Sequence, residues 1–172
     1  RLAGEAEGAA TTRVLELREQ TQRFTFTGVA EPPAVSLLRG FSAPVELDYP
    51  RDDEALARLM GADPDAFARW DAGQELARRV LLRLSDDVAA GRELVMDPRL
   101  LAACGQVLAD EGLDGSLKAL ALTLPNERIL GQHQTVVAVE GLHVARQFAV
   151  RALAVGLQAQ WRSEERRVGK EC

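Results

Sequence analysis

Few residues of this chain could act in catalysis or bind a metal, and the two histidines are the first candidates. His133 lies in "QHQ" and His143 in "EGLHVAR", three residues after Glu140. Residues at i and i+3 share a helix face, so Glu140 and His143 form a Glu-x-x-His pair. A di-iron carboxylate site needs two such pairs and two further carboxylates on facing helices. Because the sequence holds no second pair, we interpret this one as a local hydrogen-bonded pair on a helix surface, with a helical metal protein as the remote alternative.

Other reactive side chains have structural explanations. Cys104 in "LLAACGQVL" is flanked by apolar residues, which favours a buried small hydrophobe over a nucleophile. The aspartate pairs at 52–53 and 86–87 fall at expected helix ends or loops, where capping and solvation account for them. Residues 69–71, within "FARWDAGQEL", are interpreted as a packing and hydrogen-bonding cluster, because a buried indole N–H needs a partner.

Catalytic motifs with known mechanics are absent from the sequence. It contains no His-Glu-x-x-His helix, Gly-x-Ser-x-Gly elbow, P-loop, Gly-x-Gly-x-x-Gly loop or Cys-x-x-Cys pair. We therefore predict that this chain itself holds no catalytic, cofactor-binding or metal-ligating residue.

Composition narrows the class of protein. The chain has 172 residues, of which 47% are hydrophobic and 27% charged, as is usual for a globular chain. Its net charge of −5 and the lack of a basic face argue against nucleic acid as a partner. The longest weakly polar run, residues 135–157, carries too many charges for a membrane span. With two cysteines and no disulfide framework, we expect a reducing, cytoplasmic location.

Period-two patterns occupy the first 50 residues. We expect a loop over 1–12 and short strands over 13–18, 22–29, 35–38 and 43–49. These strands are too few to bury both faces of a β-sandwich, so we expect the remaining strands to lie upstream of Arg1. Residues 1–50 are therefore predicted to be the C-terminal strands of an incomplete β-sandwich domain.

Helical patterns follow Pro50. We expect a helix over 51–61, and a second one with Asp63 as its cap and Pro64 in its first turn. Further helices are expected at about 97–110, 114–123 and 134–160. Residues 51–161 are thus predicted to be the N-terminal part of a solenoid-like helical domain. The fold class is mixed and mainly α: a short antiparallel β segment followed by helices.

The charged segment "RSEERRVGKEC" at 162–172 has no apolar face. We interpret it as a non-native tail, and the alternative is a solvated helix end.

Several longer stretches together suggest a family. They are "LELREQTQRFTFTGV", "PPAVSLLRGFSAPVELDY" and "DAFARWDAGQEL", and more weakly "LADEGLDGSLKALALTLP". From about residue 13 to 157, the sequence resembles the bacterial aminopeptidase N (alanyl aminopeptidase) family of zinc metallopeptidases. The resemblance implies a domain junction near Tyr49–Asp52, between the end of a β-sandwich and the start of a helical C-terminal domain.

The family resemblance also implies a function. Such hydrolases remove N-terminal residues from peptides in peptide catabolism, with a zinc ion on a His-Glu-x-x-His helix and a distal Glu that activate water. None of these motifs has a matching position here, so no catalytic or metal residue is carried over.

The resemblance implies that this segment is a non-catalytic fragment, inactive alone. It would supply inter-domain scaffold and part of the cover over the active-site cleft. Its partners would be the missing catalytic domain and the rest of the helical domain, and peptides and zinc would bind to the parent enzyme. The candidates for packing at the β–α junction are Phe41, Pro44, Phe67 and Trp70. The alternative is a stand-alone helical protein-interaction module without enzymatic activity.

Overall fold

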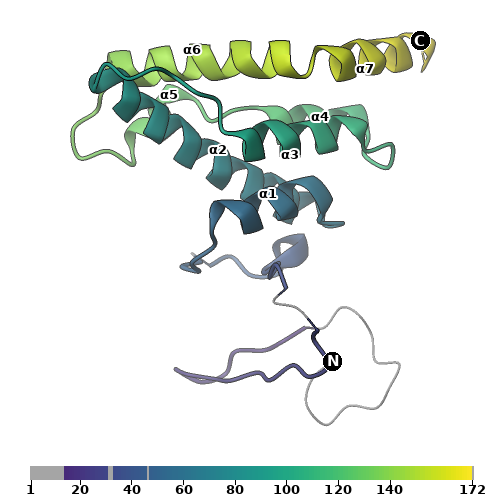
Figure 1. The fold of residues 1–172 in the computed structure, drawn as a ribbon. Helices are drawn as coiled ribbons and strands as arrows, with labels where there is room; N and C mark the ends of the chain where they lie inside the picture. Colours follow the sequence, from purple (N-terminus) through teal and green to yellow (C-terminus); the bar gives the residue numbers. More distant parts are fainter. Residues whose placement is uncertain (1–13, 31–32, 46, 172) are drawn as a thin grey trace. The chain divides into compact units, whose positions relative to one another are not determined.

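The structure is a computed structural model that describes residues 14–30, 33–45 and 47–171, with side chains as far as residue 166. The chain divides into two compact units, Arg1–Ala34 and Val35–Cys172 (Figure 1). The loop expected over 1–12 lies outside the described residues.

The first unit is extended chain in its described part. Residues 19–21 form a bend, across which the Arg18 N–H donates to Oε1 of Gln22 at 2.9 Å. Phe26 forms an isolated β-bridge, and no strand runs through the described residues of this unit. The predictions of a strand over 22–29, and of one over 13–18 in its described residues 14–18, are therefore wrong. Extended backbone becomes a strand only where a neighbour pairs with its N–H and C=O groups along its length.

The strands expected over 35–38 and 43–49 are likewise absent from the described residues of the second unit. A 3₁₀ turn, η1 (Arg39–Phe41), separates the two segments. Leu38, Gly40 and Phe41 have φ angles of 54°, 63° and 53°, in the left-handed region that interrupts extended chain. The mainly helical fold class is confirmed, and the strand assignments within it are corrected.

Seven α-helices, joined by short connecting segments, follow η1 in the described part of the second unit. They are α1 (Asp53–Ala62), α2 (Ala66–Ala89), α3 (Pro98–Ala109), α4 (Gly115–Leu122), α5 (Glu127–Gly131), α6 (Val139–Gly156) and α7 (Gln158–Glu171).

Asx residues begin most of these helices. The side chains of Asp52, Asp65, Asp97, Asp114 and Asn126 each accept a hydrogen bond from a backbone N–H in the first turn of α1 to α5. Such a cap satisfies one of the amides that have no partner within the helix.

The predicted cap of α2, Asp63, is wrong. Asp63 ends α1, where its Oδ1 accepts from the Asp65 N–H at 2.8 Å and pairs with Arg39 at 3.1 Å. With its carboxylate engaged there, the capping role passes to Asp65.

The long helix expected over 134–160 is shorter than predicted. Residues 132–138 lie outside any helix, in a turn and a bend, and the Ala138 N–H donates to Oε1 of Gln134 at 3.0 Å. The helical path is interrupted at Leu157 (φ −112°), and α7 then continues to Glu171. Most of the segment interpreted as a tail, residues 162–171, is therefore part of a helix.

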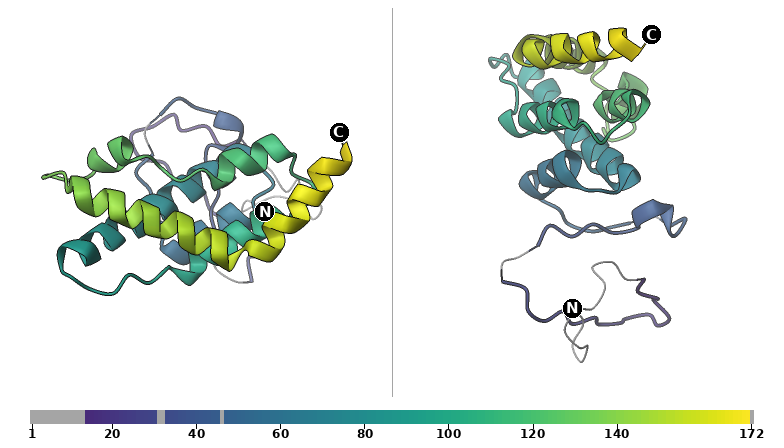
Figure 2. Two further views of the ribbon diagram at one scale, coloured as in Figure 1. Left: turned by 90° about the horizontal axis from the view of Figure 1, so that it is seen from above. Right: turned by 90° about the vertical axis from the view of Figure 1, so that its right-hand side faces the viewer.

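Helix α2 is the centre of the packing. It contacts α1, α3, α4, α5 and α6, and the helices stack in layers with α6 and α7 along one side (Figures 1 and 2). A Cβ on Gly141 would lie 2.7 Å from Oγ of Ser85, so α6 crosses α2 closely at this glycine. The fully buried large side chains of this core include Leu56, Met60, Leu76, Leu81, Leu100, Leu130 and Leu142.

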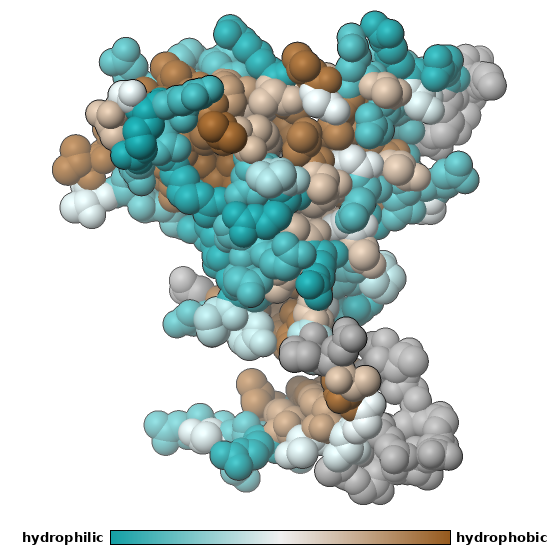
Figure 3. All heavy atoms as spheres, viewed as in Figure 1, coloured by the Kyte–Doolittle hydropathy of each residue, from teal (hydrophilic) through white to brown (hydrophobic). Residues whose placement is uncertain are grey.

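The outer surface of α6 is partly apolar. Val144, Val150 and Val155 are exposed at 37%, 43% and 78%. Figure 3 shows apolar side chains among polar ones over this layer. None of the helices in the described ranges is both long and apolar enough to cross a membrane.

Candidate functional site

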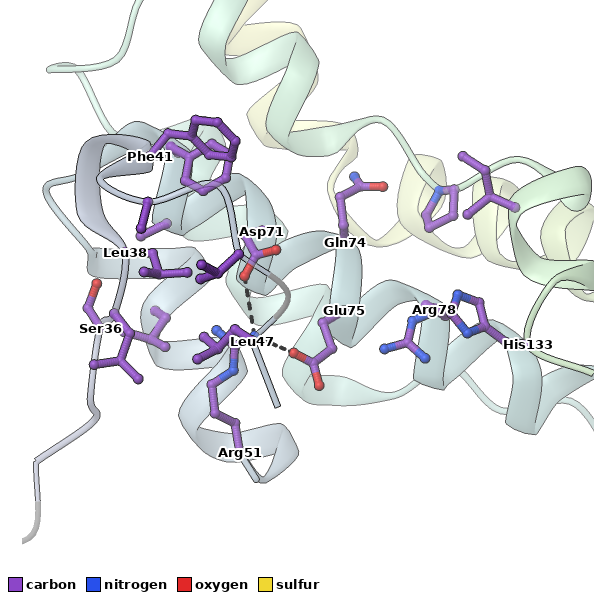
Figure 4. A pocket seen from close by; sticks show the side chains of 18 residues that line it. Ser36, Leu38, Phe41, Leu47, Arg51, Asp71, Gln74, Glu75, Arg78 and His133 are labelled. Atoms are coloured by element: carbon purple, nitrogen blue, oxygen red, sulfur yellow. Dashed lines mark hydrogen bonds and ion pairs between the residues drawn. The ribbon is translucent and has the colours of Figure 1, made fainter. Parts of the chain in front are cut away.

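A cavity of about 340 Å³ lies beside α2 in the second unit (Figure 4). One wall is the polar face of α2, with Asp71, Gln74, Glu75 and Arg78 at i, i+3, i+4 and i+7. This spacing places the four side chains on one face of the helix. The opposite wall comes mainly from residues 36–47, before α1.

Apolar and aromatic side chains form the second wall. Leu38, Phe41, Val45 and Leu47 line it, together with Phe67 from the first turn of α2. The rings of Phe41 and Phe67 meet edge to face with 5.2 Å between their centroids. An aromatic contact of this kind favours one placement of the segment against α2.

The two carboxylates of the polar wall, Asp71 and Glu75, are paired with arginines. Arg51, whose side chain is 13% exposed, pairs with Oδ2 of Asp71 at 3.2 Å and with Glu75. Glu75 also pairs with Arg79, which donates to the main-chain oxygen of Arg51 at 2.7 Å. These contacts tie the chain before α1 to the middle of α2.

The end of the cavity away from Phe41 carries a charge that is unpaired among the described residues, unlike the middle of the polar wall, where the charges are paired. Arg78 and His133 lie there, at the end opposite Phe41 (Figure 4). Burial and the nearby Arg78 cation lower the pKa of His133. Within the described part of the chain, Arg78 has no hydrogen bond or ion pair. This end therefore presents a positive charge beside a neutral imidazole.

A second charged cluster lies outside the cavity, where α1, α2 and α3 meet. Asp53 pairs with Arg79 at 3.1 Å, with Arg83 at 2.8 Å and with Arg99 at 3.5 Å. Asp97 pairs with the same Arg83 and Arg99, and the hydrogen bond from Arg99 lowers the pKa of Asp97. Asp53 is only 12% exposed in its side chain, so ion pairing and not solvation explains it. The cluster therefore joins α1, α2 and α3.

The remaining aspartate doublet is explained by the end of α2. Asp87 pairs with Arg92, 2.6 Å away, and the Asp86 carbonyl accepts from the Ala90 N–H at 3.0 Å. This agrees with the structural interpretation given to the doublet.

The Glu-x-x-His interpretation needs a correction. Nδ1 of His143 lies 2.8 Å from Oε1 of Glu127 on α5, so the hydrogen-bonded partner is not Glu140. The pair is on the surface, as expected, but it joins two helices. In the described ranges no three His, Cys, Asp or Glu side chains come together as a metal site would require.

Cys104 is buried as predicted, and burial raises the pKa of its thiol to about 12. A thiol that stays protonated is a poor nucleophile.

The cluster of residues 69–71 divides among three surroundings, because successive helical residues point about 100° apart. Arg69 is buried, Trp70 is half-buried against Phe67 with 5.9 Å between ring centroids, and Asp71 lines the cavity. The hydrogen-bonding centre is Arg69. Of the packing candidates, Phe41, Phe67 and Trp70 are in ring contact, while Pro44 is exposed.

Sequence reasoning missed the cavity-lining Gln74, Glu75 and Arg78. Their i, i+1 and i+4 spacing within one polar helix face was visible in the sequence. That this face lines a cavity depends on the opposite wall, which comes from residues 36–45 and Leu47, and the local sequence pattern did not predict where that segment lies.

Comparison with known families gives two matches. Residues 53–171 match the family described as "Domain of unknown function (DUF3458_C) ARM repeats". Residues 2–50 match "Domain of unknown function (DUF3458) Ig-like fold".

Curated relatives are named Aminopeptidase N. The chain is 34% identical to the Caulobacter vibrioides protein over 91% of this chain and 18% of the relative. It is 34% identical to the Haemophilus influenzae protein over 88% of this chain, and 31% identical to that of Escherichia coli over 87%. The chain therefore spans less than one fifth of the length of these relatives.

A solved structure is also similar. The Legionella pneumophila aminopeptidase A in complex with aspartic acid matches 84% of this chain and 16% of its own, with a TM-score of 0.69 and 28% sequence identity. Together with the curated relatives, this match confirms the resemblance to the aminopeptidase N family.

Proposed function

The chain belongs to the DUF3458_C family of ARM repeats, and from this premise we propose that it is a non-catalytic part of a zinc-dependent aminopeptidase. The observation that carries the proposal is the 34% identity to an Aminopeptidase N over 91% of the chain. The enzyme would remove N-terminal residues from peptides.

The proposed role of this segment is scaffold and part of the cover over the active-site cleft. The packing supports a rigid body, because α2 contacts five other helices and the charged cluster around Asp53 joins three. A rigid cover restricts entry to the cleft and keeps bulk water from it.

The described residues do not fit a zinc site, because no group of three suitable ligands occurs among them. In the proposal, zinc, the water-activating Glu and the peptide-binding residues belong to other parts of the enzyme. The buried free thiol of Cys104 supports a reducing, cytoplasmic location.

Activity measurements test this proposal. Three proteins would be purified: the product of the complete gene, the same product without residues 53–171, and the present 172-residue chain. Hydrolysis of alanine p-nitroanilide would be followed with added zinc. We expect hydrolysis by the complete product, a loss of at least tenfold in the deletion variant, and none by the present chain.

Two results would contradict the proposal. Hydrolysis by the present chain at a rate near that of the complete product would show that the chain is catalytic. A complete product without peptidase activity would favour the alternative, an interaction module.

A further inference from the structure

The far end of the cavity beside α2 contains an arginine whose surroundings differ from those of its neighbours. On the same helix, Arg69, Arg79 and Arg83 all pair with carboxylates. Arg78 is half-buried in the cavity wall and has no such partner among the described residues. Its guanidinium donors are therefore open to an anion that enters the cavity.

The remainder of the cavity has the polarity of a small-molecule site. Its volume of about 340 Å³ is within the usual range of about 300–1,000 Å³. Leu38, Phe41 and Leu47 supply an apolar surface facing the polar side of α2.

One hydrogen-bond acceptor in the cavity is also available for an N–H group of a ligand. Gln74 uses its Nε2 to donate to the carbonyl of Thr123 at 2.8 Å. Its Oε1 has no donor among the described residues.

These features together indicate the ligand. A guanidinium is planar and matches a carboxylate with two parallel hydrogen bonds. The neighbouring His133 has a pKa lowered by burial and by Arg78, and adds no second positive charge near neutral pH. An amide oxygen and an apolar wall suit a peptide better than a wholly polar anion.

We propose that this cavity binds a short apolar peptide through its free C-terminal carboxylate, which pairs with Arg78 while the apolar side chains contact Leu38, Phe41 and Leu47. The choice of a peptide rests on the proposed function, whereas the carboxylate and the apolar contacts rest on the cavity.

Calorimetric titration of the full chain tests the proposal with a matched pair of probes. N-acetyl-Leu-Leu has a free carboxylate, and N-acetyl-Leu-Leu-amide replaces it with a neutral amide. We expect the acid to bind at least tenfold more tightly than the amide. Arg78→Gln should remove that preference, while Arg151→Gln on the exposed surface of α6 should leave it unchanged.

A second variant separates the apolar contact from the charge. Leu47→Asp should weaken both probes, whereas Arg78→Gln should weaken only the acid. Far-UV circular dichroism shows whether each variant keeps its helices. N-acetyl-Leu should bind at least tenfold more weakly than N-acetyl-Leu-Leu if the occupant is a peptide.

Equal binding of acid and amide, no binding of either up to 10 mM, or an unchanged preference in Arg78→Gln would each overturn the proposal. Equal binding of N-acetyl-Leu would overturn the assignment to a peptide in favour of a simple carboxylate. Because binding is measured on this chain, its outcome is distinguishable from a failure of the complete gene product to hydrolyse peptides.

Discussion

Arg69 on α2 donates through Nη1 to the carboxylate of Asp110, which ends α3, with 2.6 Å between Nη1 and Oδ2. The same guanidinium donates to the carbonyl oxygens of Met60 at 3.0 Å and Gly61 at 2.9 Å. Those carbonyls belong to the last turn of α1, where helix oxygens lack intrahelical partners. One buried side chain therefore joins the ends of α1 and α3 to α2.

Replacing Arg69 should destabilise the fold strongly. In Arg69→Gln the carbonyls of Met60 and Gly61 and the Asp110 carboxylate lose their donor, and we expect a loss of about 2–4 kcal/mol in the free energy of unfolding. Urea denaturation followed by circular dichroism measures it. The matched control, Arg151→Gln on the surface, should stay within about 0.5 kcal/mol. Equal midpoints for the two variants would contradict this account of Arg69.

Stability should fall in acid partly through Asp110. The hydrogen bond from Arg69 lowers the pKa of Asp110 in the folded chain below its ordinary value. The folded state therefore binds this proton less readily than the unfolded state. The contribution is complete above the ordinary pKa of about 3.9, and is lost as the pH falls through the lower folded value.

Urea melts between pH 2 and 6 test this contribution. Asp110→Asn should flatten the acid limb of the stability profile, because the group no longer titrates. Asp86→Asn, on the exposed surface near the end of α2, is the matched control, and a flattening seen only in Asp110→Asn assigns the effect to the pair with Arg69. An unaltered slope in Asp110→Asn would show that the pair with Arg69 is not linked to acid unfolding.

Ending the chain at Trp161 should lower the free energy of unfolding, because Lys118 loses its carboxylate partner. The Lys118 side chain is 4% exposed, and its Nζ lies 3.1 Å and 3.2 Å from the carboxylate oxygens of Glu164 and 2.9 Å from the carbonyl of Leu108. Removing residues 162–172 would leave a buried ammonium without its counter-charge. We expect a loss of about 3 kcal/mol, the scale for breaking a buried pair at one partner.

The double variant supplies the control for this truncation. Lys118→Met in the shortened chain should recover much of the lost stability, because no charge is then buried. If the shortened chain melts at the same urea concentration as the full one, the contact with α7 is dispensable.

The thiol of Cys104 should be protected in the folded protein. Burial raises its pKa to about 12, so the thiolate fraction at pH 8 is about 10⁻⁴, compared with about one quarter for a free cysteine. In a Cys172→Ser background, we expect its reaction with Ellman's reagent to be at least 100-fold slower in buffer than in 8 M urea. Similar rates in both would mean that the thiol is accessible.

Several helices followed from local sequence. The Asp, Asn and Pro residues at helix starts and the apolar spacing predicted α3 and α4 within one or two residues, because capping and amphipathicity are local. Helix α5 was missed and α6 was started too early. The short α5 lies between two of the expected helices, in a segment to which no element was assigned. The turns before α6 include a side-chain contact, in which Gln134 accepts from the Ala138 N–H.

The sequence alone determined that the chain is mainly helical and resembles the aminopeptidase N family. Helix periodicity and family motifs depend only on the order of neighbouring residues, so they can be recognised without the fold. Tertiary structure decided which residue caps α2, since Asp63 is held by Arg39, and which acid pairs with His143, since α5 lies against α6. It also decided that Arg69 would be neutralised and Arg78 would face a cavity. The two arginines are nine residues apart on one helix, and their different environments come from the elements that pack against each side of it.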